Sequence, residues 1–524
     1  MSAIPEGYLG ASGRIAAGPA PELVAAGYER ELADNDLLAA GMGLSDIAHV
    51  LSLGDHGVIA PDGERSLLAA LLELEDLDPA TLADARYGDL YNVRERWLEQ
   101  RIGGAGGWLA AGRPRRESGR IAFRIGLRSR VLELEAAVAR FAAALVEQAD
   151  RHRATLMPDF TYLQVAQPTT AGHWLLSFAA PAIRDGERLR RDFAWVNASP
   201  AGAGGVNGSR VPVDRERLAG DLGFDAVIEH TRDAMWQTDG LVELVSHAAL
   251  AATTASRLAE DLEIYASEPF GFVRVAAEHC RASALMPQKR NPYALPVIRG
   301  AAGTLIGRAA GLAATQRTPS GRTDNLLYAY GDTAGAVALA TDAVALAAAV
   351  VEQLELDVEA LARPLLEGFA MAADLADVLM LETGLDHRSC YRVVGRAVAL
   401  AIERGEGSSA LDQEALDSAA RELLDRPLNV PAESIADALD VDASIASRTV
   451  TGGAAAIPMA RMLHADAERA RALAADVAGR RERLEAAEAR LRERARARIA
   501  LLGDGQHPPG SLSAAAHHDE SAPD

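Results

Sequence analysis

Cysteine, aromatic side chains and excess basic charge are all scarce in this sequence. It holds only two cysteines, Cys280 and Cys390, among 524 residues. Two distant cysteines exclude a disulfide framework and are typical of a protein of the reducing cytoplasm. The formal net charge of −21 and the pI of about 5.1 argue against nucleic acid or an anionic membrane as a partner, because both bind basic surfaces. An anionic small molecule would therefore have to be bound by a local cluster of cations.

Targeting and cofactor signals are also missing. The start of the chain lacks the basic residues and apolar core of a signal peptide. The apolar run Ala336–Val351 contains Asp342 and is rich in alanine, which predicts a packed helix instead of a membrane span. No HExxH or paired CxxC spacing occurs, and the glycine-rich stretch Ala201–Arg210 matches neither a P-loop nor a dinucleotide fingerprint. The sequence thus predicts a soluble protein without a metal or organic cofactor.

Most of the chain shows helical periodicity instead. Apolar residues recur at helical spacing and predict long helices at residues 125–156, 239–266, 296–316, 332–354 and 458–502. The segment 157–172, bounded by Pro158 and Pro168, is predicted to be a loop, and no β-sheet is predicted. The fold class is therefore all-α, with the longest helices in the middle of the chain.

Glycine-rich and polar breaks divide the chain into five parts. We expect an N-terminal helical domain, a central long-helix bundle, a small C-terminal helical domain, a helical extension and a disordered tail. Their ranges are 1–115, 116–363, 364–455, 456–502 and 503–524.

Four polar stretches lie between the helices, at residues 113–116, 161–167, 283–291 and 318–325. The third places the Ser283 hydroxyl close to cations and an amide that can bind carboxylates. Taken singly, each stretch also has an ordinary interpretation as solvated charge or a helix cap.

Together the four stretches resemble the motifs of the fumarase/aspartase superfamily, and most closely those of argininosuccinate lyases. Leu285-Met-Pro-Gln-Lys-Arg-Asn-Pro292 resembles the signature loop of that family. Gly112-Arg-Pro-Arg115 lies where these lyases carry an arginine-rich first motif, and Thr161–His173 is similar to their second. Residues 256–262, 268–272, 374–377 and 443–453 also correspond, so the resemblance covers about residues 28–455.

The resemblance implies a homotetramer in which long helices from all chains form one core and each active site takes loops from three chains. It implies removal of a β-proton from a substituted succinate and cleavage of the adjacent C–N bond, with release of fumarate. Such chemistry needs a base at the β-carbon, cations for the dianionic intermediate and a proton source for the departing nitrogen.

The family roles carry over residue by residue. Ser283 aligns with the serine base, and its alkoxide would need stabilisation by backbone N–H groups and Lys289. The other expected substrate contacts are Asn291, Thr161, Gln167, Arg113, Arg115, Arg116 and Asn325.

The sequence departs from the family pattern at the nitrogen end of the substrate. Tyr162 stands where the family has a histidine, and Pro296 stands where it has the glutamate that orients this histidine. Loss of both is coherent, because the glutamate has no function without the imidazole. In the first motif, Pro114 and Arg116 replace a serine and an asparagine.

Two interpretations follow. In the first, the enzyme cleaves a different N-substituted succinate, with Tyr162 as proton donor and Arg116 bound to an added negative charge on the leaving group. In the second, the protein is a catalytically inactive structural or binding homologue, like the lens crystallins built on this fold. We favour the first, because Ser283, Lys289 and Asn291 are retained as a set together with Thr161.

Overall fold

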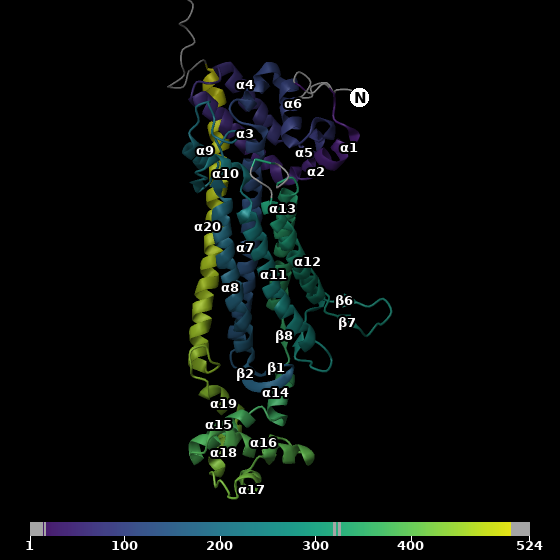
Figure 1. Cartoon of the computed structure of the whole chain (residues 1–524), viewed down its shortest axis with the longest axis vertical. Coiled ribbons are helices and arrows are strands. Elements are labelled where there is room, and N and C mark those ends of the chain that lie inside the picture. The colour runs from purple at the N-terminus through teal and green to yellow at the C-terminus, as the bar shows by residue number, and fades with distance from the viewer. Residues whose placement is uncertain (1–13, 15–16, 318–320, 323–325, 505–524) are drawn as a thin grey trace, which may run out of the picture.

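The computed structural model describes residue 14 and residues 17–317, 321–322 and 326–504. Its long helices run side by side along the longest axis of the molecule, with smaller helices gathered at both ends (Figure 1). The bundle consists of α7 (Arg115–Arg151), α8 (Ala171–Val196), α11 (Asp239–Tyr265), α12 (Ala294–Ala313) continued by η5 (Ala314–Arg317), α13 (Ala329–Glu352) and α20 (Ala456–Gly503). The prediction of an all-α fold with long central helices is confirmed.

Helix α7 is the central element of the bundle. It packs against α3, α8, α13 and α20, and most of its 37 residues are buried. Its contact with α3 depends on glycine, because a Cβ on Gly126 would lie 2.2 Å from the Leu37 carbonyl oxygen. Small residues allow helix backbones to approach closely, so this contact ties the N-terminal helices to the bundle.

The helices of the N-terminal segment cover one end of the bundle, the upper end in Figure 1. They are α1 (Pro21–Leu23), η1 (Val24–Tyr28), α2 (Glu29–Leu32), α3 (Asn35–Asp55), α4 (Pro61–Glu75), α5 (Pro79–Leu82), η2 (Ala85–Tyr87), α6 (Leu90–Ile102) and η3 (Gly103–Ala110). The insertion between α8 and α11 lies at the same end (Figure 1). It contains β3 (Ala198–Ser199), α9 (Arg215–Asp221), β4 (Ala226–Val227) and α10 (Thr231–Trp236).

A small helical domain with its own apolar core occupies the opposite end. Its elements are α14 (Val358–Glu367), α15 (Ala372–Thr383), α16 (His387–Glu403), η6 (Ser408–Ala410), α17 (Gln413–Leu424), α18 (Ala432–Leu439) and α19 (Val441–Ser447). From there α20 runs back along the whole bundle (Figure 1). A buried ion pair between Arg480 and Glu135 joins α20 to α7.

Short strands connect the helices at several places. They are β1 (Leu156–Thr161) with β2 (Gln164–Thr170), β5 (Val273–Arg274) with β8 (Glu355–Leu356), and β6 (Arg281–Ala282) with β7 (Arg290–Asn291), while η4 is Ala277–His279. The prediction of a loop at residues 157–172 was wrong, because this segment forms the β1–β2 hairpin. Pro158 and Pro168 lie opposite each other in it. Both strands of a two-stranded ribbon are edge strands, where proline is tolerated.

Two helices are long and apolar enough to cross a membrane by length and composition, α3 and α13. In α3, 78% of the apolar window is buried inside the fold, as in the core helix of a soluble protein, whereas in α13 the share is 50%. Half of the apolar window of α13 is therefore not fully buried within its own chain.

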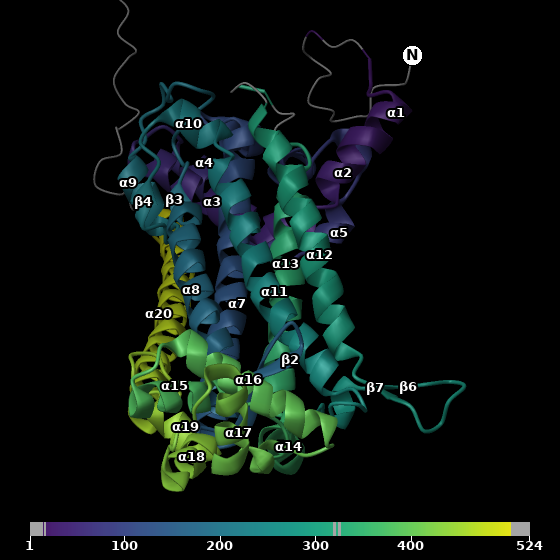
Figure 2. The same cartoon turned by 60° about the horizontal axis from the view of Figure 1, so that its bottom comes forward.

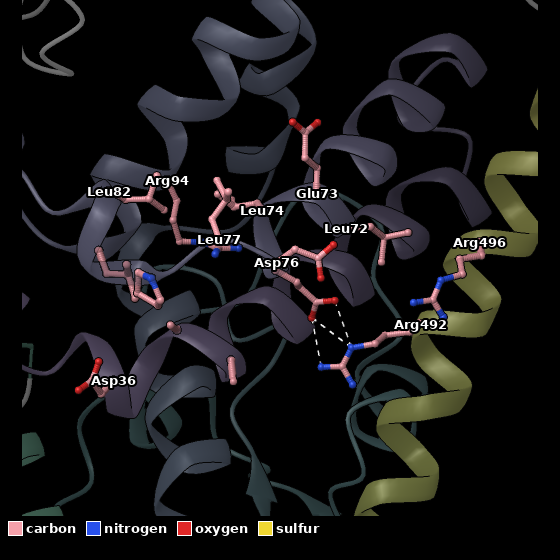
Figure 3. A pocket seen from close by; sticks show the side chains of 15 residues that line it. Asp36, Leu72, Glu73, Leu74, Asp76, Leu77, Leu82, Arg94, Arg492 and Arg496 are labelled. Carbon is pink, nitrogen blue, oxygen red and sulfur yellow. Dashed lines mark hydrogen bonds and ion pairs between the residues drawn. The ribbon is translucent and has the colours of Figure 1, made fainter.

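A cleft of about 740 Å³ separates the N-terminal helices from α20 (Figure 3). Arg492 of α20 reaches across it to the Glu75 carboxylate, with nitrogen–oxygen distances of 3.1–3.3 Å. None of the predicted site residues lines this cleft.

Candidate active site

Ser283 lies in a projecting hairpin held together by β6 and β7. The Asn291 side-chain amide donates to the Arg281 carbonyl oxygen over 3.1 Å. The Arg290 guanidinium donates to the Val275 carbonyl oxygen over 2.6 Å. These bonds close the base of the hairpin, which stands away from the molecule in both views (Figures 1 and 2).

Two backbone donors converge on the Ser283 hydroxyl oxygen. The N–H groups of Leu285 and Met286 lie 3.3 and 3.0 Å from it. The Lys289 backbone N–H donates to the Met286 carbonyl oxygen over 3.1 Å, and its ammonium group is exposed and forms no ion pair within the described part of the chain. Such a group of donors would stabilise a negatively charged serine oxygen.

Thr161, Tyr162 and Gln167 lie on the β1–β2 hairpin. Because Thr161 pairs with Gln164, Tyr162 and Leu163 alone form the turn. Their φ angles are 55° and 57°, as in a type I′ turn, which favours Asn-Gly. Tyr162 is 98% exposed, and Thr161 and Gln167 are exposed as well. The hairpin therefore presents the predicted proton donor to solvent.

A polar network anchors this hairpin to the small helical domain. His173 Nδ1 lies 3.0 Å from the Thr169 hydroxyl and Nε2 lies 3.0 Å from the Gly452 carbonyl oxygen. Asp374 accepts a hydrogen bond from Arg448. The structure thus brings together segments 374–377 and 443–453, and both ring nitrogens of His173 are used in contacts within the chain.

Arg113 is buried in a contact with α3. Its guanidinium donates to the Asp46 carboxylate over 2.6 Å and to the Ser45 hydroxyl over 2.9 Å, and only 2% of its side chain is exposed. Asp46 also binds Arg94, at 2.8 Å. In this position Arg113 fixes the loop before α7, and the structure gives no support to a direct substrate contact.

Arg115 and Arg116 form the first residues of α7 and line a cavity of about 50 Å³. Arg115 pairs with Asp89 at 2.8 Å, and Arg116 pairs with Glu31 at 3.6 Å. Both side chains are about 30% exposed, so both guanidiniums remain accessible to a ligand.

The glycine-rich loop at 201–210 binds a carboxylate of the chain itself. Glu117 accepts hydrogen bonds from the N–H groups of Gly202 and Gly204, at 2.6 and 2.7 Å. Burial raises the pKa of Glu117 to about 7, against the lowering influence of Arg113. The loop has the form of an anion-binding nest, and Glu117 occupies it.

The start of α7 lies far from the hairpin that carries Thr161. Arg115 begins α7, and the hairpin with Thr161 follows shortly after α7 ends. A helix of 37 residues at 1.5 Å per residue separates these ends by roughly 55 Å. The Ser283 hairpin projects from the side of the bundle (Figure 1). One chain therefore does not bring Arg115 together with Thr161.

Two further sequence predictions concern Asn325 and Pro296. Asn325 lies outside the described residues. Pro296 lies in the first turn of α12, where proline is tolerated because its missing N–H would have no helical partner. The described residues contain no group of three or more His, Cys, Asp or Glu side chains that could hold a metal ion.

Sequence reasoning missed Arg120 and Tyr330, which also line the cavity at the start of α7. Arg120 donates to the Tyr330 hydroxyl and, over 2.8 Å, to the Met235 carbonyl oxygen. A signal was present, because Arg116, Arg120, Arg124 and Arg128 recur every four residues along α7.

The comparisons with known proteins place this long-helix bundle, with smaller helical domains at its ends, in the fumarase/aspartase superfamily of lyases. The lyase family matches residues 82–307, and the argininosuccinate lyase C-terminal family matches residues 369–446. The chain belongs to the argininosuccinate lyase family, and it is a carbon–nitrogen lyase.

Individual relatives support this assignment along most of the chain. The argininosuccinate lyase of Methanoculleus marisnigri is 34% identical over 433 residues, which are 82% of this chain and 85% of the relative. The argininosuccinate lyase of Haloarcula marismortui is 34% identical over 88% of this chain and 90% of its own. A solved structure of an EDDS lyase variant with bound fumarate has a TM-score of 0.82 and 25% identity, and the match covers 94% of this chain and 98% of that one.

Proposed function

We propose that this protein cleaves, or forms in reverse, a C–N bond of an N-substituted succinate, with fumarate as the unsaturated product. Ser283 takes the β-proton, and the electron pair of that C–H bond forms the double bond as the C–N bond breaks. The leaving nitrogen receives a proton from Tyr162. The relative solved with bound fumarate supports this substrate class.

The environment of the Ser283 hydroxyl is the main support for this proposal. Two backbone N–H groups at 3.3 and 3.0 Å favour the ionised form of this oxygen. Lys289 of the same hairpin carries an exposed ammonium group. Asn291 is held in the same hairpin.

The amine partner is proposed to differ from arginine. Tyr162 and Pro296 replace the histidine and glutamate of the family pattern, so the nitrogen end of the substrate is handled differently. A group that leaves as a stable anion would need no donor. Arg116, partly accessible at the cavity where α7 begins, is placed to bind an additional negative charge on the leaving group.

A homotetramer with shared sites is part of the proposal. An antiparallel partner would bring the start of its α7 close to the β1–β2 hairpin of the first chain. Exposed apolar residues on α11 and α12 support such a partner, since Leu250, Val297 and Ile306 are 42–58% exposed. The glycines of α12 also face open space within the chain. A Cβ added at Gly300, Gly303, Gly307 or Gly311 would have no neighbour within 4 Å outside its own helix backbone. We place this assembly in the cytoplasm.

The test mixes purified protein with fumarate and a panel of amines, amidines and nitrite, and follows the loss of fumarate absorbance. Ser283→Ala is expected to lower the rate about 100- to 10,000-fold, the usual contribution of a general base. Ser66→Ala is the matched control, because its hydroxyl only bonds the Asp62 carbonyl oxygen within α4. Turnover that survives Ser283→Ala would overturn the serine-base assignment.

Tyr162→Phe separates the proton donor from the base. A rate that falls with basic amines but not with nitrite supports the donor role, whereas an unchanged rate with every partner assigns Tyr162 to packing. If wild-type protein turns over no partner, a non-catalytic helical scaffold replaces the proposal.

A further inference from the structure

The β1–β2 hairpin has an exposed tip and a buried base. Residues 161–165 are exposed, whereas Pro168, Thr169 and Thr170 are buried. Thr161 pairs with Gln164, which precedes Thr169 by five residues. The tip therefore extends roughly 16 Å beyond the base, at about 3.3 Å per residue. Contacts near the base determine the direction in which this extended tip points.

One contact fixes the hairpin to the long-helix bundle. The Phe160 ring packs against the rings of three aromatic residues at the end of α11 and just after it, with centroids 5.8–6.1 Å apart. These residues are Tyr265, Phe270 and Phe272. An apolar contact of this kind has little directionality, so it holds one point of the hairpin and leaves rotation about that point open.

His173 supplies a second contact, which leads to the small helical domain. Its backbone N–H donates to the Thr170 hydroxyl over 3.1 Å, so the residue is joined to the end of β2. Because a carbonyl oxygen only accepts, Nε2 carries the hydrogen that binds Gly452. In the neutral imidazole Nδ1 then accepts from the Thr169 hydroxyl. The side chain thus ties the buried base of the hairpin to the turn at Gly452.

The turn that accepts this bond is closely constrained. Gly452 has a φ angle of 82°, which favours glycine. A Cβ on Gly453 would lie 2.2 Å from the Arg448 carbonyl oxygen. The Asp374 carboxylate accepts hydrogen bonds from both Ser444 and Arg448. The Gly452 carbonyl is therefore presented by a segment with little freedom, and β1 and β2 also pack against α14 and α19 at this end of the bundle (Figures 1 and 2).

The length of the hairpin makes its tip sensitive to the base. A rotation of about 4° at the base moves the tip by about 1 Å over this length. Such a shift takes a hydrogen bond of normal length beyond about 3.6 Å, where it no longer counts as one. Loss of the His173 bonds would therefore affect a substrate contact that His173 itself does not make.

We propose that His173 is a positioning residue, which holds the β1–β2 hairpin against the small helical domain so that Thr161 meets a carboxylate of the succinyl group. The inference rests on the proposed lyase function. His173 transfers no proton in this role. Both ring nitrogens are used in holding the hairpin, and Thr161 provides the contact to the substrate.

The test is a double-mutant cycle read from the dissociation constant of fumarate, measured by calorimetric titration. His173→Leu should weaken binding about 10- to 100-fold, the usual contribution of a hydrogen bond to a charged group. In a Thr161→Val background the same change should cost less than about twofold, because the contact to be positioned is already absent. His173→Gln should restore most of the affinity, since its amide nitrogen can replace Nε2 as donor.

Two further variants separate positioning from a general loss of stability. Thr169→Val removes only the partner of Nδ1 and should weaken fumarate binding in the same direction. His56→Leu is the matched control, because His56 also donates to a backbone carbonyl oxygen, that of Ser52 over 2.8 Å, but within the N-terminal helices. It should leave the affinity unchanged. Urea denaturation of each variant confirms that it is folded under the conditions of titration.

The outcomes distinguish this inference from the proposed function. Equal weakening by His173→Leu in the wild-type and Thr161→Val backgrounds, or no weakening in either, would overturn the positioning role while turnover keeps the lyase function intact. The expected cycle in a protein that binds fumarate but never turns it over would contradict the proposed function alone. A wild-type protein that does not bind fumarate would contradict both.

Discussion

Tyr162 and Leu163 hold a backbone conformation that neither side chain favours. Both have φ near 55°, where a non-glycine residue is disfavoured by about 1–2 kcal/mol. Asn and Gly would relieve this strain in a two-residue turn. The Tyr162 side chain at this strained tip is 98% exposed, so it has no packing role in its own chain. This exposure is consistent with a functional role for the phenol.

Glycine at either turn position should stabilise the protein. We expect Leu163→Gly and Tyr162→Gly each to raise the free energy of unfolding by about 1 kcal/mol. Glycine has no Cβ, so it adopts the left-handed conformation without a steric cost. Urea denaturation measures this change. The two variants should differ in activity, since only Tyr162→Gly removes the proposed proton donor. Equal loss of activity in both would indicate that the turn shape and not the phenol matters.

The loop that starts α7 is positioned by a charge cluster between helices. Asp46 of α3 binds both Arg94 of α6 and Arg113 of the loop, and its carboxylate is fully buried. Three elements are therefore held by one side chain. The arginines that follow, Arg115 and Arg116, depend on this anchor for their positions at the cavity.

Replacing this anchor should destabilise the protein strongly. Asp46→Asn keeps the shape of the side chain but leaves Arg94 and Arg113 as buried charges without a counterion. We expect a loss of about 3–5 kcal/mol in the free energy of unfolding, measured by urea denaturation. Asp62→Asn, at an exposed carboxylate in α4 whose closest cation is 4.0 Å away, is the control and should change stability by less than about 0.5 kcal/mol. A small effect of Asp46→Asn would show that the arginines are held by other contacts.

Several buried carboxyl groups affect the stability of the whole molecule. Burial raises the pKa of Glu117 and of Glu64 to about 7, and that of Asp34 and of Asp192 to about 6. A carboxyl with a raised pKa binds its proton more tightly in the folded state than in the unfolded state. The contribution of these four groups to stability is therefore greatest in acid and decreases as the pH rises from about 4.5 through 7, the opposite of the common case for carboxylates.

Glu117→Gln should weaken this pH dependence, because the amide does not titrate. Between pH 5 and 7.5 we expect the wild type to lose about 2–3 kcal/mol more stability than the variant, following the shift of Glu117. Urea denaturation at the two pH values measures the difference. Glu147→Gln is the control, because Glu147 lies on α7 with 74% of its side chain exposed. A steeper loss in Glu117→Gln would contradict the direction of this pKa shift.

Shared active sites can be tested by mixing inactive chains. Ser283 and Thr161 lie in separate parts of one chain, so we expect Ser283→Ala and Thr161→Val proteins to complement each other after subunit exchange. If each site takes these residues from different chains, an equal mixture has roughly a quarter of its sites intact. The rate should rise toward roughly one quarter of the wild-type value, with size-exclusion chromatography as a check on assembly. No rise in exchanged tetramers would place both residues in one chain.

The sequence by itself determined the class of fold and the identity of the chemical groups. Helical periodicity over long segments depends on local spacing, so the central helices were predictable to within a few residues except at the start of α7, which begins ten residues before the expected 125. The polar stretches around Ser283, Thr161 and Arg115 were recognisable because their residues are adjacent in sequence. The β1–β2 hairpin was not, because two opposed prolines obscure the alternation of a strand.

Only the tertiary structure decided which of these groups are accessible and what surrounds them. Arg113 and Arg116 look alike in sequence, yet Arg113 is buried against Asp46 and Arg116 faces a cavity. Arg120 and Tyr330 come from different helices and meet there through packing, without any local pattern that joins them. Whether a polar atom has a partner depends on residues distant in the chain, and burial then sets the cost of leaving it unpaired.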